Sequence, residues 1–173
     1  MNILFLDLDG TVRRSCSGKT FINDPKDQEL IPGVKEAIAQ YSDWLIVGIT
    51  NQGGVLAGHK SLANCIREQS FTLELIPQME RIYFCPDNGE TCYLVSHEER
   101  EGYQAYWDCD RLTTTRKYRK PEPGMIEAAL ESLKSSPEKA LFVGDRAEDE
   151  LAANRADIPF MWAEIWREEK GKR

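Results

Sequence analysis

Short runs of apolar residues recur along this chain, and most of them end at a cluster of polar residues or at a glycine. Runs of this length that are rich in Ile, Leu, Val and Phe are typical of strands buried in a sheet. They predict strands at residues 3–6, 44–49, 81–84 and 140–143, and a fifth strand or extended segment at residues 158–162.

Between these runs, apolar residues recur three and four positions apart, which is the spacing of one face of a helix. The first such segment begins after Gly33 and places Val34, Ala37 and Ile38 on one side. Further helices are predicted at about residues 60–75, 121–133 and 148–155. Strands that alternate with helices predict an α/β fold, in which a mainly parallel sheet carries helices on both faces.

The segments outside this pattern are expected to be loops. Residues 12–32 are polar and rich in turn-forming residues, which predicts a loop or hairpin over the end of the first strand. Residues 85–118 show no clean periodicity, so we expect a loop insertion there within a single domain spanning residues 1–173. The aromatic and arginine side chains of this insertion suit the recognition of a sugar or base, or equally a small satellite core. Residues 168–173 are charged and are expected to form a frayed tail.

The composition limits the kinds of partner. The net charge of −7 over 173 residues argues against a general affinity for nucleic acid. No apolar run approaches the length of a membrane span, and the early first strand leaves no room for a signal peptide. Five cysteines, an odd count, suit reduced thiols rather than a disulfide framework. We therefore expect a cytoplasmic protein that does not bind membranes.

Candidate chemistry appears where the first strand ends, in the sequence DLDGT. Asp7 and Asp9 both emerge where this strand stops, and ligands of open α/β sheets bind at the carboxyl ends of the strands. Two crowded carboxylates repel each other unless a positive charge lies between them. A hard divalent cation with oxygen ligands, usually Mg²⁺, meets this need. The alternative is a solvated acidic turn, because Asp-Gly is common in turns.

Four motifs in order resemble those of the haloacid dehalogenase (HAD) superfamily of phosphatases: FLDLDGT, VGITNQ, RKPEPGM and FVGDRAED. The resemblance spans nearly the whole chain and implies a HAD-type, Rossmann-like fold. The sequences TNQGG and RKPEPGM resemble the branch that holds heptose-bisphosphate, histidinol-phosphate and polynucleotide 3′-phosphatases. Members of that branch have short loops in place of a large cap domain, so we expect no large cap here.

The resemblance also implies roles for individual residues. Asp7 is expected to be the nucleophile and Asp9 the general acid and base, while Thr50 and Lys120 contact the phosphoryl group. The expected Mg²⁺ ligands are Asp7, Asp9 through its backbone carbonyl, and Asp145, with Asp149 orienting a metal-bound water. Asn51 and Arg119 are the expected substrate contacts, although a solvated Arg119 is an equal alternative.

Some members of this branch carry a zinc-binding loop, for which the candidates here are Cys85, Cys92, His97 and Cys109. Asp87 stands where the loop would have a histidine, and the spacings match no standard zinc pattern. We therefore expect that the chain binds no zinc.

These features together predict a Mg²⁺-dependent phosphatase that hydrolyses a phosphate monoester of a small metabolite through an aspartyl-phosphate intermediate. One alternative is a polynucleotide 3′-end phosphatase. Another is a phosphate-binding regulatory protein without catalysis on the same scaffold, although such a protein is expected to have lost some of these residues. Phosphotransfer to a second substrate would use the same residues as hydrolysis. The pattern does not specify an oligomeric state.

Overall fold

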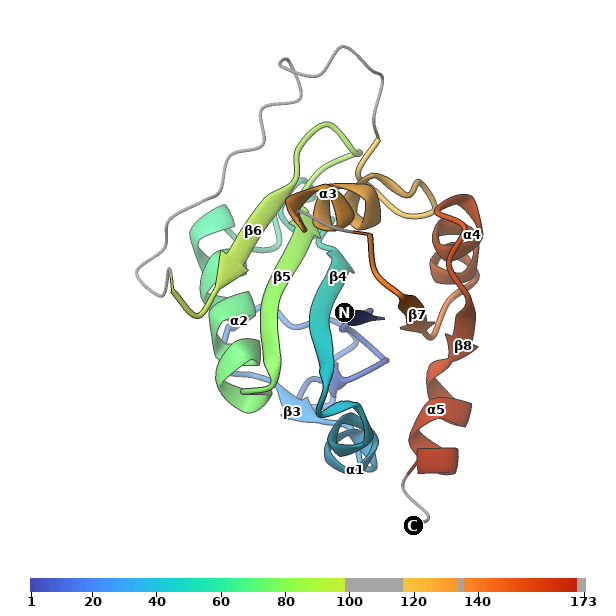
Figure 1. Cartoon of the computed structure of the whole chain (residues 1–173). Helices are drawn as coiled ribbons and strands as arrows, with labels where there is room; N and C mark the ends of the chain where they lie inside the picture. Colours follow the sequence, from blue (N-terminus) through green and yellow to red (C-terminus); the bar gives the residue numbers. More distant parts are fainter. Residues whose placement is uncertain (99–116, 134–135, 171–173) are drawn as a thin grey trace.

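The computed structural model describes residues 1–98, 117–133 and 136–170. Its centre is a six-stranded sheet in the order β6-β5-β4-β1-β7-β8 (Figure 1). The strands are β1 (Asn2–Leu6), β4 (Trp44–Asn51), β5 (Met79–Cys85), β6 (Tyr93–Ser96), β7 (Lys139–Gly144) and β8 (Phe160–Trp162). All neighbouring strands are parallel except β5 and β6. The predicted α/β architecture is therefore confirmed.

Helices cover both faces of the sheet. Alternate residues of a strand point to opposite faces, so Leu4 and Leu6 of β1 enter one core while Ile3 and Phe5 enter the other. The first core is covered by α1 (Val34–Ile38), the 3₁₀ helix η1 (Ala39–Tyr41), α2 (Leu62–Leu75) and α5 (Ala163–Lys170). The second is covered by α3 (Gly124–Ser132) and α4 (Ala147–Arg155). Burial on both faces explains why β1 is an uninterrupted apolar run.

The predicted loop or hairpin after the first strand is a hairpin. Its strands are β2 (Arg13–Arg14) and β3 (Glu29–Leu30), which pair antiparallel. The turn that leads into it contains Gly10 with a φ of +92°, a backbone conformation that favours glycine. This hairpin lies beyond the carboxyl end of β1 and brings new polar side chains to that edge of the sheet.

Two predicted loops contain regular structure instead. Within the 85–118 insertion, β6 adds an antiparallel edge strand. This strand was not predicted, because only Val95 of its residues is buried and the sequence therefore shows no apolar run. At the end of the chain, the predicted frayed tail is wrong for residues 168–170, because α5 extends to Lys170. The prediction that aromatic and arginine side chains of this insertion recognise a sugar or base concerns mainly residues 99–116, which lie outside the described ranges.

Helix α5 is held by one aromatic side chain and one cation. Trp166 is fully buried in the first core. Arg167 Nη1 donates to the carbonyl oxygens of Gly10 (3.2 Å) and Thr11 (2.7 Å), in the turn after β1. The helix therefore belongs to the folded domain and also braces its most polar turn. Within the described ranges, no helix is both long and apolar enough to cross a membrane.

Trp166→Ala should lower the free energy of unfolding by about 3–5 kcal/mol, because it removes a fully buried ring and leaves a cavity. Urea unfolding followed by circular dichroism measures this loss. Trp162→Ala is the matched control, since Trp162 is 38% exposed, and it should destabilise the protein clearly less. Equal losses in the two variants would contradict the anchoring role of Trp166.

Candidate active site

The candidate residues gather where β1, β4 and β7 end. A cavity of about 560 Å³ opens at this edge of the sheet. Among its lining residues are all eight that the sequence assigned to catalysis, substrate or magnesium: Asp7, Asp9, Thr50, Asn51, Arg119, Lys120, Asp145 and Asp149. Parallel strands deliver their carboxyl ends to a common edge, which is why residues from distant motifs converge here.

Asp7 lies at the floor of this cavity, just beyond β1. Its backbone N–H donates to the Val143 carbonyl at 2.9 Å, which continues the pairing of β1 with β7. Its Oδ1 lies 2.6 Å from Lys120 Nζ, and its Oδ2 accepts the Thr11 hydroxyl at 2.9 Å. Burial raises the pKa of Asp7 to about 7 against the pull of Lys120, and the nearby Asp149 carboxylate adds to the rise.

Lys120 is a buried cation shared between two carboxylates. Its Nζ lies 2.6 Å from an oxygen of Asp7 and 2.6 Å from Asp149 Oδ1, and it donates to the Ile49 carbonyl at 3.0 Å. Asn51 fixes its backbone, because the Asn51 side chain accepts the Lys120 N–H and donates to the Lys120 carbonyl, both at 3.0 Å. The structure thus places Asn51 as a support for Lys120, while its contact with substrate stays a prediction.

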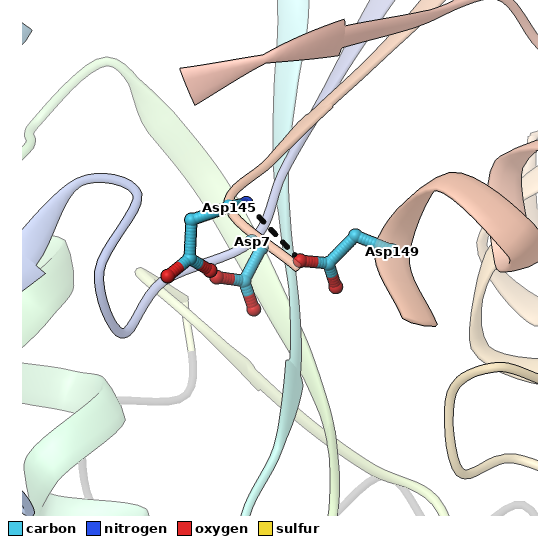
Figure 2. A group of neighbouring side chains, drawn as sticks. All are labelled: Asp7, Asp145 and Asp149. Carbon is cyan, nitrogen blue, oxygen red and sulfur yellow. Dashed lines mark hydrogen bonds between the residues drawn. The ribbon is translucent and has the colours of Figure 1, made fainter. Parts of the chain in front are cut away.

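Three carboxylates form an acidic cluster. Oxygens of Asp7, Asp145 and Asp149 lie within 4.8 Å of one another, and Figure 2 shows the Asp7 and Asp145 carboxylates side by side. The dashed line in Figure 2 joins Asp149 Oδ2 to the Asp145 N–H (3.2 Å), and the same oxygen accepts the Arg146 N–H at 3.0 Å. Asp149 is therefore engaged by Lys120 and by the start of α4.

The donor set of this cluster suits Mg²⁺. Partial desolvation of the Asp145 carboxyl group, together with the Asp149 charge, raises the pKa of Asp145, so a further positive charge would stabilise its ionised form. Asp7 and Asp145 offer the carboxylate oxygens that a hard cation prefers. Gly10 keeps the space beside them open, because a Cβ there would lie 2.2 Å from Asp145 Oδ2. The residues present thus fit a divalent cation.

Asp9 is held in a different electrostatic environment. Its Oδ1 accepts Arg13 Nε at 2.8 Å and its Oδ2 accepts Gln52 Nε2 at 2.9 Å. Burial alone would raise the pKa of Asp9, but Arg13, with smaller contributions from Lys60 and Gln52, lowers it below its usual value. The buried Thr50 hydroxyl accepts a second hydrogen bond from Gln52 Nε2 at 3.0 Å.

Sequence reasoning assigned no role to Arg13, Gln52 or Lys60. The only available signal for Gln52 was its place directly after Thr50 and Asn51 in the motif TNQGG. Arg13 and Lys60 carried no signal, because isolated basic residues in polar segments are usually solvated.

The rim of the cavity comes from two loops and from Arg119. Residues 14, 15 and 19–23 line the cavity, as predicted for the loop after β1, and residues 53, 54, 57, 59 and 60 contribute to the rim. Arg119 Nη1 donates to the Asp87 carbonyl at 3.3 Å. The guanidinium also packs against Gly53, where an added Cβ would lie only 3.0 Å from Nη1. Arg119 is thus half-buried at the rim rather than fully solvated.

The zinc candidates that the structure describes, Cys85, Cys92 and His97, are not among the residues that line this cavity. Cys85 and Cys92 are buried in the second core, and Cys85 Sγ contacts Asp87 Oδ1 at 3.4 Å. His97 Nε2 lies 2.9 Å from the Met79 carbonyl, and Cys109 falls outside the described residues. In the ranges that the structure describes, the acidic cluster is the group of ligands found close enough to hold a metal. The expectation of no bound zinc stays a prediction.

The sheet, its helices and the edge where Asp7, Lys120 and Asp145 meet agree with the family match and the relatives described next, which together identify a phosphatase of the HAD superfamily. The sequence profile of the polynucleotide kinase 3 phosphatase family matches residues 2–165, and the chain belongs to this family. Within the superfamily it falls in the heptose-bisphosphate branch, and it is an enzyme that hydrolyses phosphate esters.

Two relatives and one solved structure illustrate this similarity. The D-glycero-β-D-manno-heptose-1,7-bisphosphate 7-phosphatase of Haemophilus ducreyi is 30% identical over 163 residues, covering 90% of this chain and 78% of the relative. The enzyme of the same name from Vibrio cholerae is 32% identical over 161 residues, which cover 90% of this chain and 76% of the relative. The D,D-heptose 1,7-bisphosphate phosphatase of B. bronchiseptica, crystallised with magnesium and phosphate, aligns with a TM-score of 0.68 and 24% identity. The alignment covers 92% of this chain and 79% of that one.

Excess MgCl₂ should raise the unfolding temperature of the protein, because a ligand that binds only the folded state stabilises it, by about 2.7 kcal/mol at a hundred times Kd. Asp145→Asn should remove most of this rise. Glu148→Gln is the matched control, since Glu148 lines the same cavity but lies outside the acidic cluster, and it should retain the rise. An unchanged response in Asp145→Asn would contradict this metal site.

Proposed function

We propose that the enzyme hydrolyses a phosphate monoester of a small sugar or a similar metabolite, using Mg²⁺ and an aspartyl-phosphate formed on Asp7. The observation that carries this proposal is the placement of Asp7 at the cavity floor, 2.6 Å from Lys120 and beside Asp145. The sugar-phosphate class is supported by the names of the two relatives, which act on a heptose bisphosphate.

The metal would be held by the side chains of Asp7 and Asp145 and by the Asp9 backbone carbonyl. When bound, Mg²⁺ would neutralise charge on the phosphoryl oxygens and on Asp7. Lys120 adds a second positive charge next to the nucleophile, so the phosphoryl group would meet cations on two sides. Asp149 supports the site by holding both Lys120 and the Asp145 backbone.

The reaction would proceed in two displacements. In the first, an Asp7 oxygen attacks phosphorus and the bond to the leaving oxygen breaks, while Asp9, which enters this step in its protonated form, donates its proton to that oxygen. In the second, water attacks phosphorus and gives a proton to Asp9, and the bond between Asp7 and phosphorus breaks to release phosphate. Lys120 and the Thr50 hydroxyl would stabilise the charge that develops on the phosphoryl oxygens.

A polynucleotide 3′ end is the second candidate substrate. The family match favours it by name, and the cavity wall includes the basic residues Arg14, Lys19 and Arg146. The net charge of −7 counts against it, because binding to a phosphate backbone depends on excess positive charge. The non-catalytic alternative does not hold, because the chain belongs to a family of phosphatases and the residues of the proposed mechanism are all present at one site.

Asp7→Asn should lose nearly all turnover, because an amide is not a nucleophile towards phosphorus. After reaction with a ³²P-labelled substrate and acid quenching, the wild-type protein should carry the label and the Asp7→Asn variant should not. Asp43→Asn is the matched control, since Asp43 is exposed and precedes β4 at the opposite end of the strand. A variant at position 7 that keeps more than about a tenth of wild-type kcat would contradict the covalent mechanism.

Arg119→Ala should lower kcat/KM for the true substrate far more than for para-nitrophenyl phosphate, because the aryl ester lacks distal polar groups for this rim residue to bind. Phosphorylated sugars and a 3′-phosphorylated oligonucleotide, each assayed with Mg²⁺ and with EDTA, identify the true substrate first. The exposed Arg67 provides the control variant Arg67→Ala. Equal losses on both esters would instead assign Arg119 to phosphoryl binding.

A further inference from the structure

Five side chains form a closed ring of hydrogen bonds and ion pairs behind Asp9, here called the Asp9 ring. Starting from Asp9 Oδ1, it runs through Arg13 Nε (2.8 Å) and from Arg13 Nη2 to Glu68 Oε1 (2.6 Å). It continues from Glu68 Oε2 to Lys60 Nζ (2.5 Å), and from Lys60 to Gln52 Oε1 (2.9 Å). Gln52 Nε2 closes it on Asp9 Oδ2 at 2.9 Å.

The chemistry of the donors and acceptors fixes the direction of every link. A lysine ammonium only donates and an ionised carboxylate only accepts. Gln52 must therefore turn its oxygen to Lys60 and its nitrogen to Asp9, so its amide cannot flip without breaking both bonds. Both oxygens of Asp9 are thereby held, one by Arg13 and one by Gln52.

The ring is buried everywhere except at Asp9. Arg13 and Glu68 are fully buried and the Lys60 side chain is 6% exposed, whereas the Asp9 side chain is 39% exposed and lines the cavity. Arg13 Nη1 is also engaged, with Gln28 Oε1 at 3.3 Å and with the Thr72 hydroxyl. The ring thus joins Glu68 of helix α2 to Asp9, the acidic member of the ring that lines the cavity.

Fold stability alone gives little reason for such a ring. Burying the three charged side chains of Arg13, Glu68 and Lys60 carries a large desolvation cost, and well-packed apolar residues in their place are often as stable or more so. What an interlocked set of charges does provide is a single allowed geometry, because each displacement leaves a buried charge unpaired.

We propose that the Asp9 ring fixes the carboxylate of Asp9 in the orientation needed for proton transfer, and that Glu68 on α2 is a positioning residue for this step. The inference rests on the proposed acid and base role of Asp9. Glu68 acts through Arg13 and Lys60, which it holds against Asp9 and Gln52, and it is not among the residues that line the cavity.

The test compares Glu68→Gln with two substrates that differ in their need for a proton. The leaving group of an alkyl phosphate such as glucose 6-phosphate is an alkoxide, which needs a proton from a general acid. The leaving group of 2,4-dinitrophenyl phosphate is a stable phenolate anion, which does not. Glu68→Gln should lower kcat/KM about tenfold or more for the alkyl ester and less than about threefold for the aryl ester. The control Glu74→Gln makes the same change at an exposed position of α2 and should alter neither.

A double-mutant cycle shows whether Glu68 works through Asp9. In the Asp9→Asn background, Glu68→Gln should cause no further loss on the alkyl ester, because the group it positions is gone. Lys60→Met breaks the ring at a second point while keeping the pair of Arg13 and Glu68, so it provides the same comparison if Glu68→Gln does not fold. Urea unfolding of each variant identifies which of them are folded.

The outcomes separate this inference from the proposed function. If Asp9→Asn shows the leaving-group dependence but the folded ring variants do not, the positioning role of the ring is wrong and the proposed function stands. A loss in the ring variants that is equal for both esters, or that persists in Asp9→Asn, also overturns the positioning role. If Asp9→Asn itself shows no leaving-group dependence, the acid and base role of Asp9 fails and the inference fails with it.

Discussion

The site depends on one buried ammonium group. Lys120 Nζ lies within 2.6 Å of oxygens from both Asp7 and Asp149, in a region where three carboxylates crowd together. Without this charge the carboxylates would repel one another and burial would favour their protonated forms. The position of Lys120 depends in turn on Asn51, whose side chain clamps its backbone from the end of β4. The sheet register and the charge balance of the site are therefore linked.

Asp7 and Asp9 are only two residues apart, yet the fold gives them opposite electrostatic environments. Burial and the neighbouring carboxylates raise the pKa of Asp7, while Arg13 lowers that of Asp9. Leu8 between them is fully buried and fixes the backbone from which both depart. A Mg²⁺ ion beside Asp7 would favour the ionised form that a nucleophile needs, while Arg13 and Gln52 fix the orientation of the Asp9 carboxyl group.

Much of this arrangement could be predicted from the sequence, because it depends on local patterns. Apolar runs predicted the five parallel strands, the polar residues after the first strand indicated Asp7, and the motifs RKPEPGM and FVGDRAED indicated Lys120 and Asp145. The Asp9 ring could not be predicted, because Arg13 and Glu68 are 55 positions apart and each resembles an ordinary solvated residue. Helix α5 was missed for a similar reason, since its sequence is mostly charged and Trp166 is the one large side chain of residues 163–168 that is buried in the core.

The pairing of Arg13 with Glu68 also constrains how this enzyme can diverge. A neutral residue at position 13 would leave the buried Glu68 with Lys60 as its remaining cation. A neutral residue at position 68 would remove the fully buried carboxylate that pairs with Arg13. Single changes at either position therefore pass through a poorly tolerated intermediate. Descendants of this sequence should keep both charges or exchange both, so that the two positions covary and mark a lineage within the family.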